Sequence, residues 1–147
     1  MKSILVPVDG SESAGRAAAF AGKLAAAFAA KLTLLHAYDA PAAALLGMAH
    51  SQEAAIRETL NRIAERSFEG ARAAMSLAFG EGLSWEAVQK VATAGNPARE
   101  IVAHAKGNHS DLIVMGSRGL SVIQEITVGS VSDRVLRLAP CAVTIVR

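Results

Sequence analysis

The sequence contains little of several features that mark particular classes of protein. A single cysteine, Cys141, excludes an intrachain disulfide and suits a reducing compartment. Aromatic residues make up only 4% of the chain, and the net charge is only +2 with scattered basic residues, which argues against a nucleic-acid surface. No apolar run approaches the ~18 residues of a membrane span or forms a signal-peptide core. We therefore expect a cytoplasmic protein that neither inserts into a membrane nor binds nucleic acid.

Apolar residues, in contrast, are abundant. They make up 52% of the 147 residues, which suits one compact domain over residues 1–147. Several short apolar runs have the continuous pattern of strands in a parallel sheet that is covered on both faces. These runs are Ile4–Val8, Leu32–Tyr38, Asp111–Gly116 and 142–147.

Helical patterns fill most of the segments between these runs. Ser11 or Ser13 can cap a helix in which Phe20, Leu24 and Phe28 form an apolar stripe at spacing four. The alternation of strands and helices predicts an α/β fold with right-handed crossovers. In such folds ligands bind beyond the carboxyl ends of the strands, where the strand order reverses.

Three further helices are indicated. One runs from Glu53 to about Met75, with Ile63 among its apolar positions. Another begins after Asn96 and ends at Gly107, and the last begins with Ser130 as its N-cap. The segment LSWEAVQKVATAG fits either a helix or an edge strand, and its periodicity does not decide between them.

The glycines around the last helix predict a binding site for phosphate. Gly116 and Gly119 follow a buried strand, and Gly129 directly precedes a helix. A glycine there serves a positive φ angle or the close approach of another group. The helix start offers free N–H groups and a partial positive charge, to which Ser130 and Ser132 add hydroxyl groups.

The motif G-x2-G-x9-G-[S/T] at Gly116, Gly119, Gly129 and Ser130 resembles that of the universal stress protein family, in its ATP-binding branch. The stretches ILVPVDGS, LLHAYD, GNPAREI and SDLIVMGSRG occur in the family's order. The resemblance implies a single-domain three-layer α/β/α fold of the adenine nucleotide alpha hydrolase-like type. Its five-stranded parallel sheet would have the order 3-2-1-4-5, with Glu86 to Ala92 as an edge strand. It also implies a homodimer that pairs the last strands, here Ala142 to Val146.

The resemblance also implies a set of ligand contacts. Asp9 would lie near the ribose and phosphates, with Mg²⁺ or Mn²⁺ linking its carboxylate to the phosphates. The backbone of Ala37 would recognise adenine. Leu120 and Glu125 stand where family loops often carry basic residues, so ADP or AMP remains an alternative to ATP. The implied nucleotide-binding residues are Pro7, Val8, Asp9, Ala37, Met115, Gly116, Arg118, Gly119, Gly129, Ser130, Val131 and Ser132.

Three functions are compatible with these residues. The first is a dimeric nucleotide-binding module of the stress response whose state an unknown protein partner reads. The second is a slow ATPase assisted by a metal at Asp9, although no paired general base is visible beside a nucleophile. The third is a dimeric interaction protein without a ligand, which the retained glycine motif disfavours. His36 and Cys141 are interpreted as packing residues rather than reactive groups.

Overall fold

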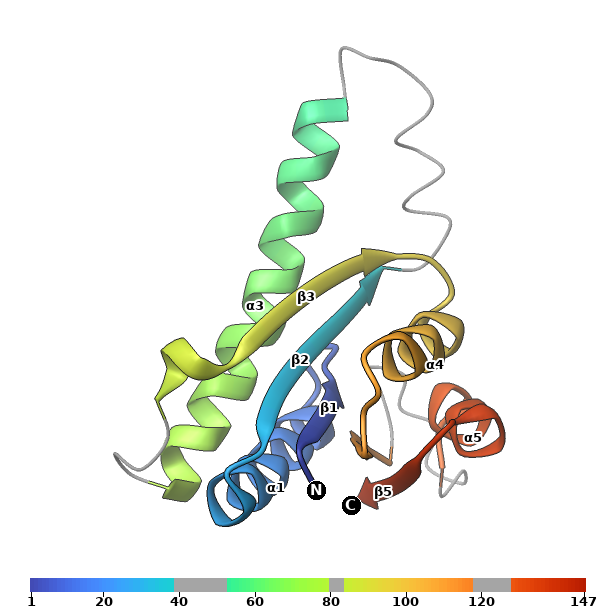
Figure 1. Ribbon diagram of the computed structural model, residues 1–147. Helices are drawn as coiled ribbons and strands as arrows, with labels where there is room; N and C mark the ends of the chain where they lie inside the picture. The colour runs from blue at the N-terminus through green and yellow to red at the C-terminus, as the bar shows by residue number, and fades with distance from the viewer. Residues whose placement is uncertain (39–52, 80–83, 118–127) are drawn as a thin grey trace.

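A computed structural model describes residues 1–38, 53–79, 84–117 and 128–147. Five parallel strands form one sheet in the order β3-β2-β1-β4-β5 (Figure 1), which confirms the predicted order. After β1 the chain adds β2 and β3 toward one edge of the sheet, and it later adds β4 and β5 toward the other edge. The strand order therefore reverses between β1 and β4. The strands are β1 (Ser3–Pro7), β2 (Lys31–Tyr38), β3 (Gln89–Ala94), β4 (Leu112–Gly116) and β5 (Ala142–Val146).

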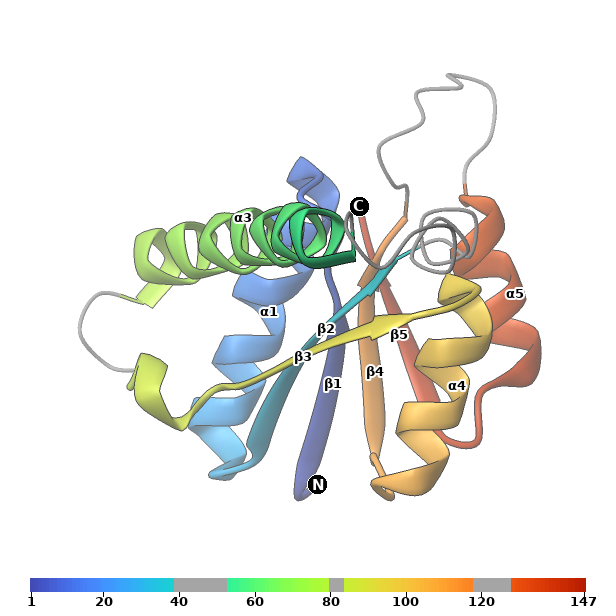
Figure 2. The ribbon, with the colours of Figure 1, turned by 90° about the horizontal axis from the view of Figure 1, so that it is seen from above.

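Helices cover both faces of the sheet. α1 and α3 lie on one face, and α4 and α5 lie on the other (Figure 2), which gives the three predicted layers. A short 3₁₀ helix, η3, precedes β3. None of the described helices is long and apolar enough to cross a membrane. Their bounds are α1 (Glu12–Phe28), α3 (Glu53–Phe79), α4 (Pro97–Gly107), α5 (Ser130–Leu138) and η3 (Trp85–Ala87).

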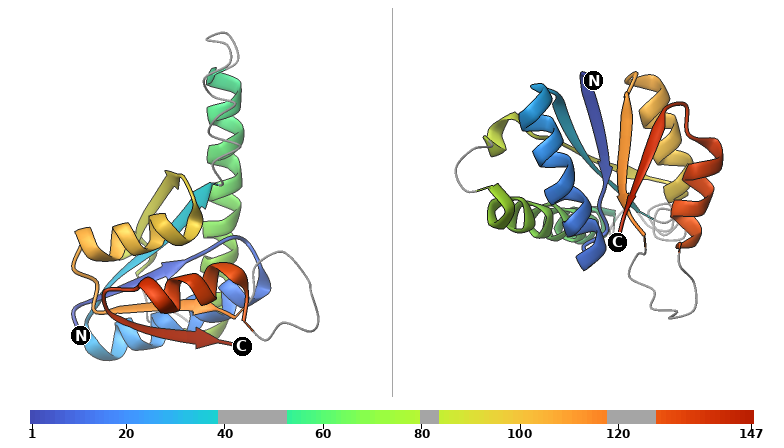
Figure 3. Two further views of the ribbon diagram at one scale, coloured as in Figure 1. Left: turned by 90° about the vertical axis from the view of Figure 1, so that its right-hand side faces the viewer. Right: turned by 90° about the horizontal axis from the view of Figure 1, so that it is seen from below.

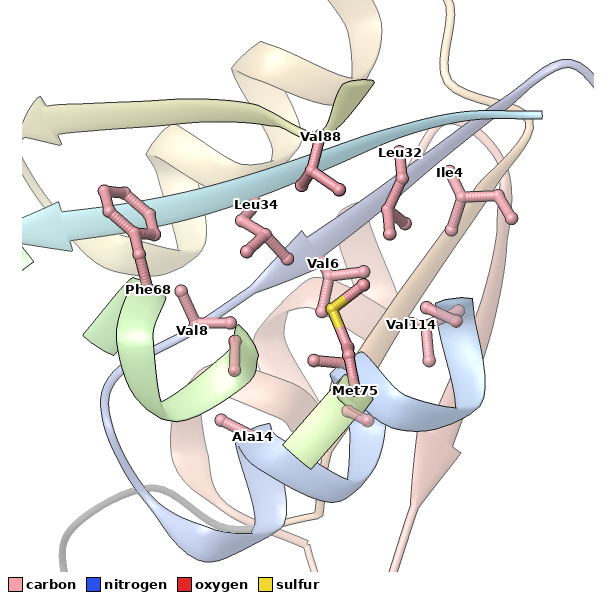
Figure 4. Packing of buried hydrophobic residues seen from close by; sticks show 14 of the residues in the cluster. Ile4, Val6, Val8, Ala14, Leu32, Leu34, Phe68, Met75, Val88 and Val114 are labelled. Atoms are coloured by element: carbon pink, nitrogen blue, oxygen red, sulfur yellow. The ribbon is translucent and has the colours of Figure 1, made fainter. Parts of the chain in front are cut away.

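Two apolar layers hold the helices on the sheet. Ile4, Val6 and Leu34 point toward α1 and α3 (Figure 4), whereas Leu5 and Leu35 point toward α4 and α5. Neighbouring residues of each strand thus bury their side chains on opposite faces, because side chains alternate along a strand. This double burial explains why the strands are continuous apolar runs rather than alternating ones.

Of the apolar stripe predicted for α1, Leu24 packs against the core, but the two phenylalanines do not. Phe20 is 39% exposed and Phe28 is 57% exposed. The helix instead buries a face of small side chains, because these let it lie close to both α3 and the sheet. Its predicted cap is resolved in favour of Ser11, whose Oγ accepts a hydrogen bond from the Ala14 amide at 3.2 Å. The buried alanines of α1 are Ala14, Ala17, Ala18, Ala21 and Ala25.

Two other predicted segments differ from the structure. α3 continues to Phe79, and it exposes Ile63 while burying Ala64 and Phe68. Its N-terminal part extends past the sheet (Figure 3), so its apolar face is fixed by α1 and β2 only along the remainder. The edge strand predicted at Glu86 to Ala92 is β3 at Gln89–Ala94, and residues 85–87 form η3 instead.

Candidate functional site

A cavity of about 230 Å³ lies at the carboxyl ends of β1, β2 and β4. It is on the face covered by α4 and α5, at the point where the strand order reverses. Ligands of open α/β sheets bind at this kind of position. Its lining residues are Pro7, Val8, Asp9, Ala14, Leu35, Ala37, Pro97, Ile101, Met115, Gly116, Gly129, Ser130, Val131 and Ser132.

The predicted binding residues that the structure describes all line this one cavity. They come from the ends of three strands and the start of α5, which are far apart in the sequence. Arg118 and Gly119 lie outside the described residues, as do Leu120 and Glu125. That the described residues contact a nucleotide remains a prediction.

Sequence reasoning missed four residues of the lining: Ala14, Leu35, Pro97 and Ile101. Leu35 carries a usable signal, because it lies two residues before Ala37 and so faces the same side of the sheet. It also pairs with Pro7 in the register of β1 and β2. Ile101 lies one helical turn after Pro97, the first residue of α4, so both fall on one helix face.

The start of α5 forms the polar end of the cavity. The Gly129 amide donates to the Ser117 carbonyl at 2.7 Å, and the Gly129 carbonyl accepts from the Asp133 amide at 2.9 Å. The amides of Ser130, Val131 and Ser132 have no carbonyl one turn earlier in the helix. Together with the helix dipole, these amides create a site that favours an anion.

The structure distinguishes Ser130 from Ser132. The N-cap of α5 is Gly129, which makes no side-chain cap bond, so Ser130 is the first helical residue rather than the cap. Ser132 is buried, and its hydroxyl donates to the Gly116 carbonyl at 2.9 Å. That proton is therefore committed to holding α5 against the end of β4. Ser130, in contrast, is exposed at the start of the helix.

Gly116 is required by protein packing. Its φ angle is not positive, but a Cβ atom added there would lie 2.7 Å from the Ser13 carbonyl carbon of α1. In the structure this close approach is made by α1. Gly129 has φ −68° and ψ 157°, which any residue can adopt, so no turn requires a glycine there.

Asp9 has the turn role that the Asp-Gly pair predicts. Its Oδ1 accepts a hydrogen bond from the Ser11 amide at 2.9 Å, and Gly10 adopts φ +85°. Asp9 is also the only ionisable residue in the described lining of the cavity. The turn therefore holds a half-buried carboxylate in the lining of the cavity.

His36 and Cys141 pack within the protein, as predicted. The His36 side chain is 6% exposed, and its Nδ1 donates to the Val8 carbonyl at 2.9 Å. Cys141 is partly buried against the core beneath α4 and α5, and burial raises the pKa of its thiol. Among the described residues, no group of three or more His, Cys, Asp or Glu side chains is placed to hold a metal.

Comparisons with known proteins agree with this architecture. The model of the universal stress protein family matches residues 1–147. A universal stress protein of Thermus aquaticus, described as lying in the QAH/OAS sulfhydrylase 3' region, is 40% identical over 146 residues, covering 99% of this chain and 98% of that protein.

Solved structures give the same result. Universal stress protein UspA from Lactobacillus plantarum superposes with a TM-score of 0.78 at 28% identity, covering 99% of this chain and 97% of that one. A universal stress protein in complex with cAMP has a TM-score of 0.66 at 29% identity, covering 99% and 96%. Both likenesses span nearly the whole of each chain.

Proposed function

The chain belongs to the universal stress protein family, and from this premise we propose that it binds an adenine nucleotide in the cavity beside the start of α5. One observation carries the proposal. A single cavity at the reversal of strand order joins an apolar interior to a row of amides that lack a partner within their own helix. A nucleotide has the matching polarity, with an apolar ring at one end and phosphate at the other.

The cavity walls suggest how the nucleotide would lie. The base would enter between the ends of β1 and β2 and the start of α4, where Ala37, Pro97 and Ile101 line the cavity. The phosphates would reach the amides of Ser130 and Val131, which favour negative charge. Arg118 would add positive charge over the phosphates, as the sequence motif predicts.

The site also fits a divalent metal bound together with the phosphates. Mg²⁺ is commonly held by one or two carboxylates and by the oxygens of a phosphate ligand. Asp9 supplies one carboxylate in the lining of the cavity. Mg²⁺ or Mn²⁺ there would neutralise charge between Asp9 and the phosphates, so ATP would bind best with metal present.

A less charged ligand is the alternative to ATP. Without a metal, the Asp9 carboxylate repels each added phosphate, which favours AMP or ADP. The related protein solved in complex with cAMP, which carries one phosphate, gives this alternative specific support. Calorimetric titration with ATP, ADP, AMP and cAMP, each with and without Mg²⁺, separates these ligands.

We further propose that the protein acts as a homodimeric regulatory module joined through β5. Strand β5 is at the sheet edge, and Val143, Ile145 and Val146 are only partly buried. Unpaired backbone groups on an edge strand form a template for a second strand. Nucleotide occupancy would then be read by a protein partner in the response to stress.

The enzyme alternative has a separate test. A slow ATPase would depend on a metal at Asp9, so Asp9→Ala would abolish hydrolysis while ATP still binds. Loss of both together would instead assign Asp9 to binding alone. A protein that binds no nucleotide would give no binding heat with any of the four nucleotides in the calorimetric titration.

The first experiment identifies the natural ligand directly. Freshly purified protein is denatured, and any released nucleotide is identified by chromatography and mass spectrometry. Release of an adenine nucleotide supports the proposal, and its phosphate number decides between ATP, ADP and AMP. An empty protein that also fails to bind added nucleotide contradicts the proposal and favours the ligand-free dimer.

A further inference from the structure

His36 lies on the opposite face of the sheet from the cavity. Its neighbours Leu34 and Tyr38 belong to the core beneath α1 and α3, whereas Leu35 and Ala37 line the cavity. The His36 ring packs edge-on against the Tyr38 ring, with centroids 5.2 Å apart. Because a carbonyl oxygen can only accept, the 2.9 Å contact to Val8 makes Nδ1 of His36 the donor.

The hydrogen bond from His36 to the Val8 carbonyl takes the place of one backbone hydrogen bond between β1 and β2. The Val8 amide donates to the Leu35 carbonyl at 2.8 Å, so the backbone of Leu35 points toward β1. The backbone of Ala37 points the same way, because alternate residues of a parallel strand bond to the same neighbour. A continued ladder would give the Val8 carbonyl to the Ala37 amide. Here that carbonyl accepts from the His36 ring.

We infer that His36 is a positioning residue that sets the base specificity of the cavity. Because His36 donates to the Val8 carbonyl, the backbone hydrogen bonds between β1 and β2 end before the one from the Ala37 amide. The Ala37 amide and carbonyl then face the cavity, where they can bond to the edge of a base. This inference rests on the proposed nucleotide function, although its structural part can be tested without a ligand.

The chemistry of the exposed backbone selects adenine. Adenine carries an acceptor, N1, beside a donor amino group, so it complements the adjacent N–H and C=O of one residue. Hypoxanthine carries N1–H beside a carbonyl oxygen, which reverses both partners. A site built to make such bonds rejects an analogue that cannot make them. His36 therefore contributes to selectivity for AMP over IMP without touching either.

The test compares AMP with IMP, and ATP with ITP, by calorimetry on the wild type, His36→Phe and His36→Asn. Asparagine places an amide N–H near the position of Nδ1, so it keeps the bond to Val8. We expect His36→Phe to reduce the preference for adenine by about tenfold or more, and His36→Asn to restore most of it. Tyr38→Phe is the control, because the Tyr38 hydroxyl has no hydrogen-bond partner among the described residues.

A ligand-free measurement accompanies the titration. Hydrogen exchange of the Ala37 amide should be fast in the wild type and at least about tenfold slower in His36→Phe, where Val8 can rejoin the ladder. Unchanged selectivity and unchanged Ala37 exchange in His36→Phe overturn the inference, as does equal loss of selectivity in Tyr38→Phe. If the wild type binds none of the four nucleotides, the proposed function fails, and the exchange data still decide the role of His36.

Discussion

The close contact between Gly116 and α1 predicts a specific loss of stability. In Gly116→Ala the new Cβ would lie 2.7 Å from the Ser13 carbonyl carbon and 2.9 Å from the Ser13 Cβ. Both atoms are near the backbone of a buried helix start, so they cannot swing away as a flexible side chain would. Forced overpacking of this kind costs about 1–3 kcal/mol. For a chain of this length, that corresponds to a decrease in Tm of about 2–12 °C.

Urea denaturation of wild type and variant measures the change in the free energy of unfolding. Gly129→Ala is the matched control, because φ −68° and ψ 157° accept an alanine, and its stability should stay within about 1 kcal/mol. A Gly116→Ala protein as stable as the wild type would refute the packing argument. If that stable variant also lost nucleotide binding, the glycine would be required by the ligand rather than by α1.

Three further predictions concern other contacts in the molecule. Ser132→Ala leaves the Gly116 carbonyl without its donor and should lower the free energy of unfolding in urea by about 1–3 kcal/mol, whereas Ser130→Ala should not. Hydrogen bonds from the amides of Lys2 and Ser3 lower the pKa of Asp111 in the folded protein. The ionised Asp111 carboxylate therefore stabilises the fold at pH values above the pKa that it has in the unfolded chain. That effect should be lost in acid melts below about pH 4, and Asp111→Asn should lack this loss. The Val146 carbonyl accepts from the Ser117 amide, so the N–H of the preceding residue, Ile145, points away from β4 toward the open edge of the sheet. Ile145→Pro removes that N–H and should give a monomer by light scattering. A variant that stays dimeric contradicts the β5 interface.

Local signals in the sequence predicted the elements whose ends are determined locally. Asn96, Pro97 and Gly107 gave the bounds of α4 correctly, because capping and proline geometry act within a few residues. For the same reason the cap of α1 was narrowed to Ser11 or Ser13, and the structure shows that it is Ser11. Strand order followed from resemblance to the family rather than from periodicity, and the structure confirms it.

Features that depend on distant partners were not predictable in this way. β3 begins at Gln89 because it pairs with Thr33 of β2, and nothing within the segment itself specifies that register. Phe20 is exposed because α1 packs through alanines, and the narrow space between α1 and α3 admits only small side chains. Ile101 reaches the cavity only through the packing of α4 on the sheet.

The central claim is that an adenine nucleotide occupies the cavity with its phosphates at the start of α5. Titration of ¹⁵N-labelled protein with ATP and Mg²⁺, and separately with AMP, followed by amide chemical shifts, tests it most directly. We expect the largest shifts at Ala37 and at Ser130, Val131 and Ser132, which line the cavity from β2 and from the start of α5. Saturating nucleotide that leaves these amides unshifted, or shifts a distant surface instead, would contradict it.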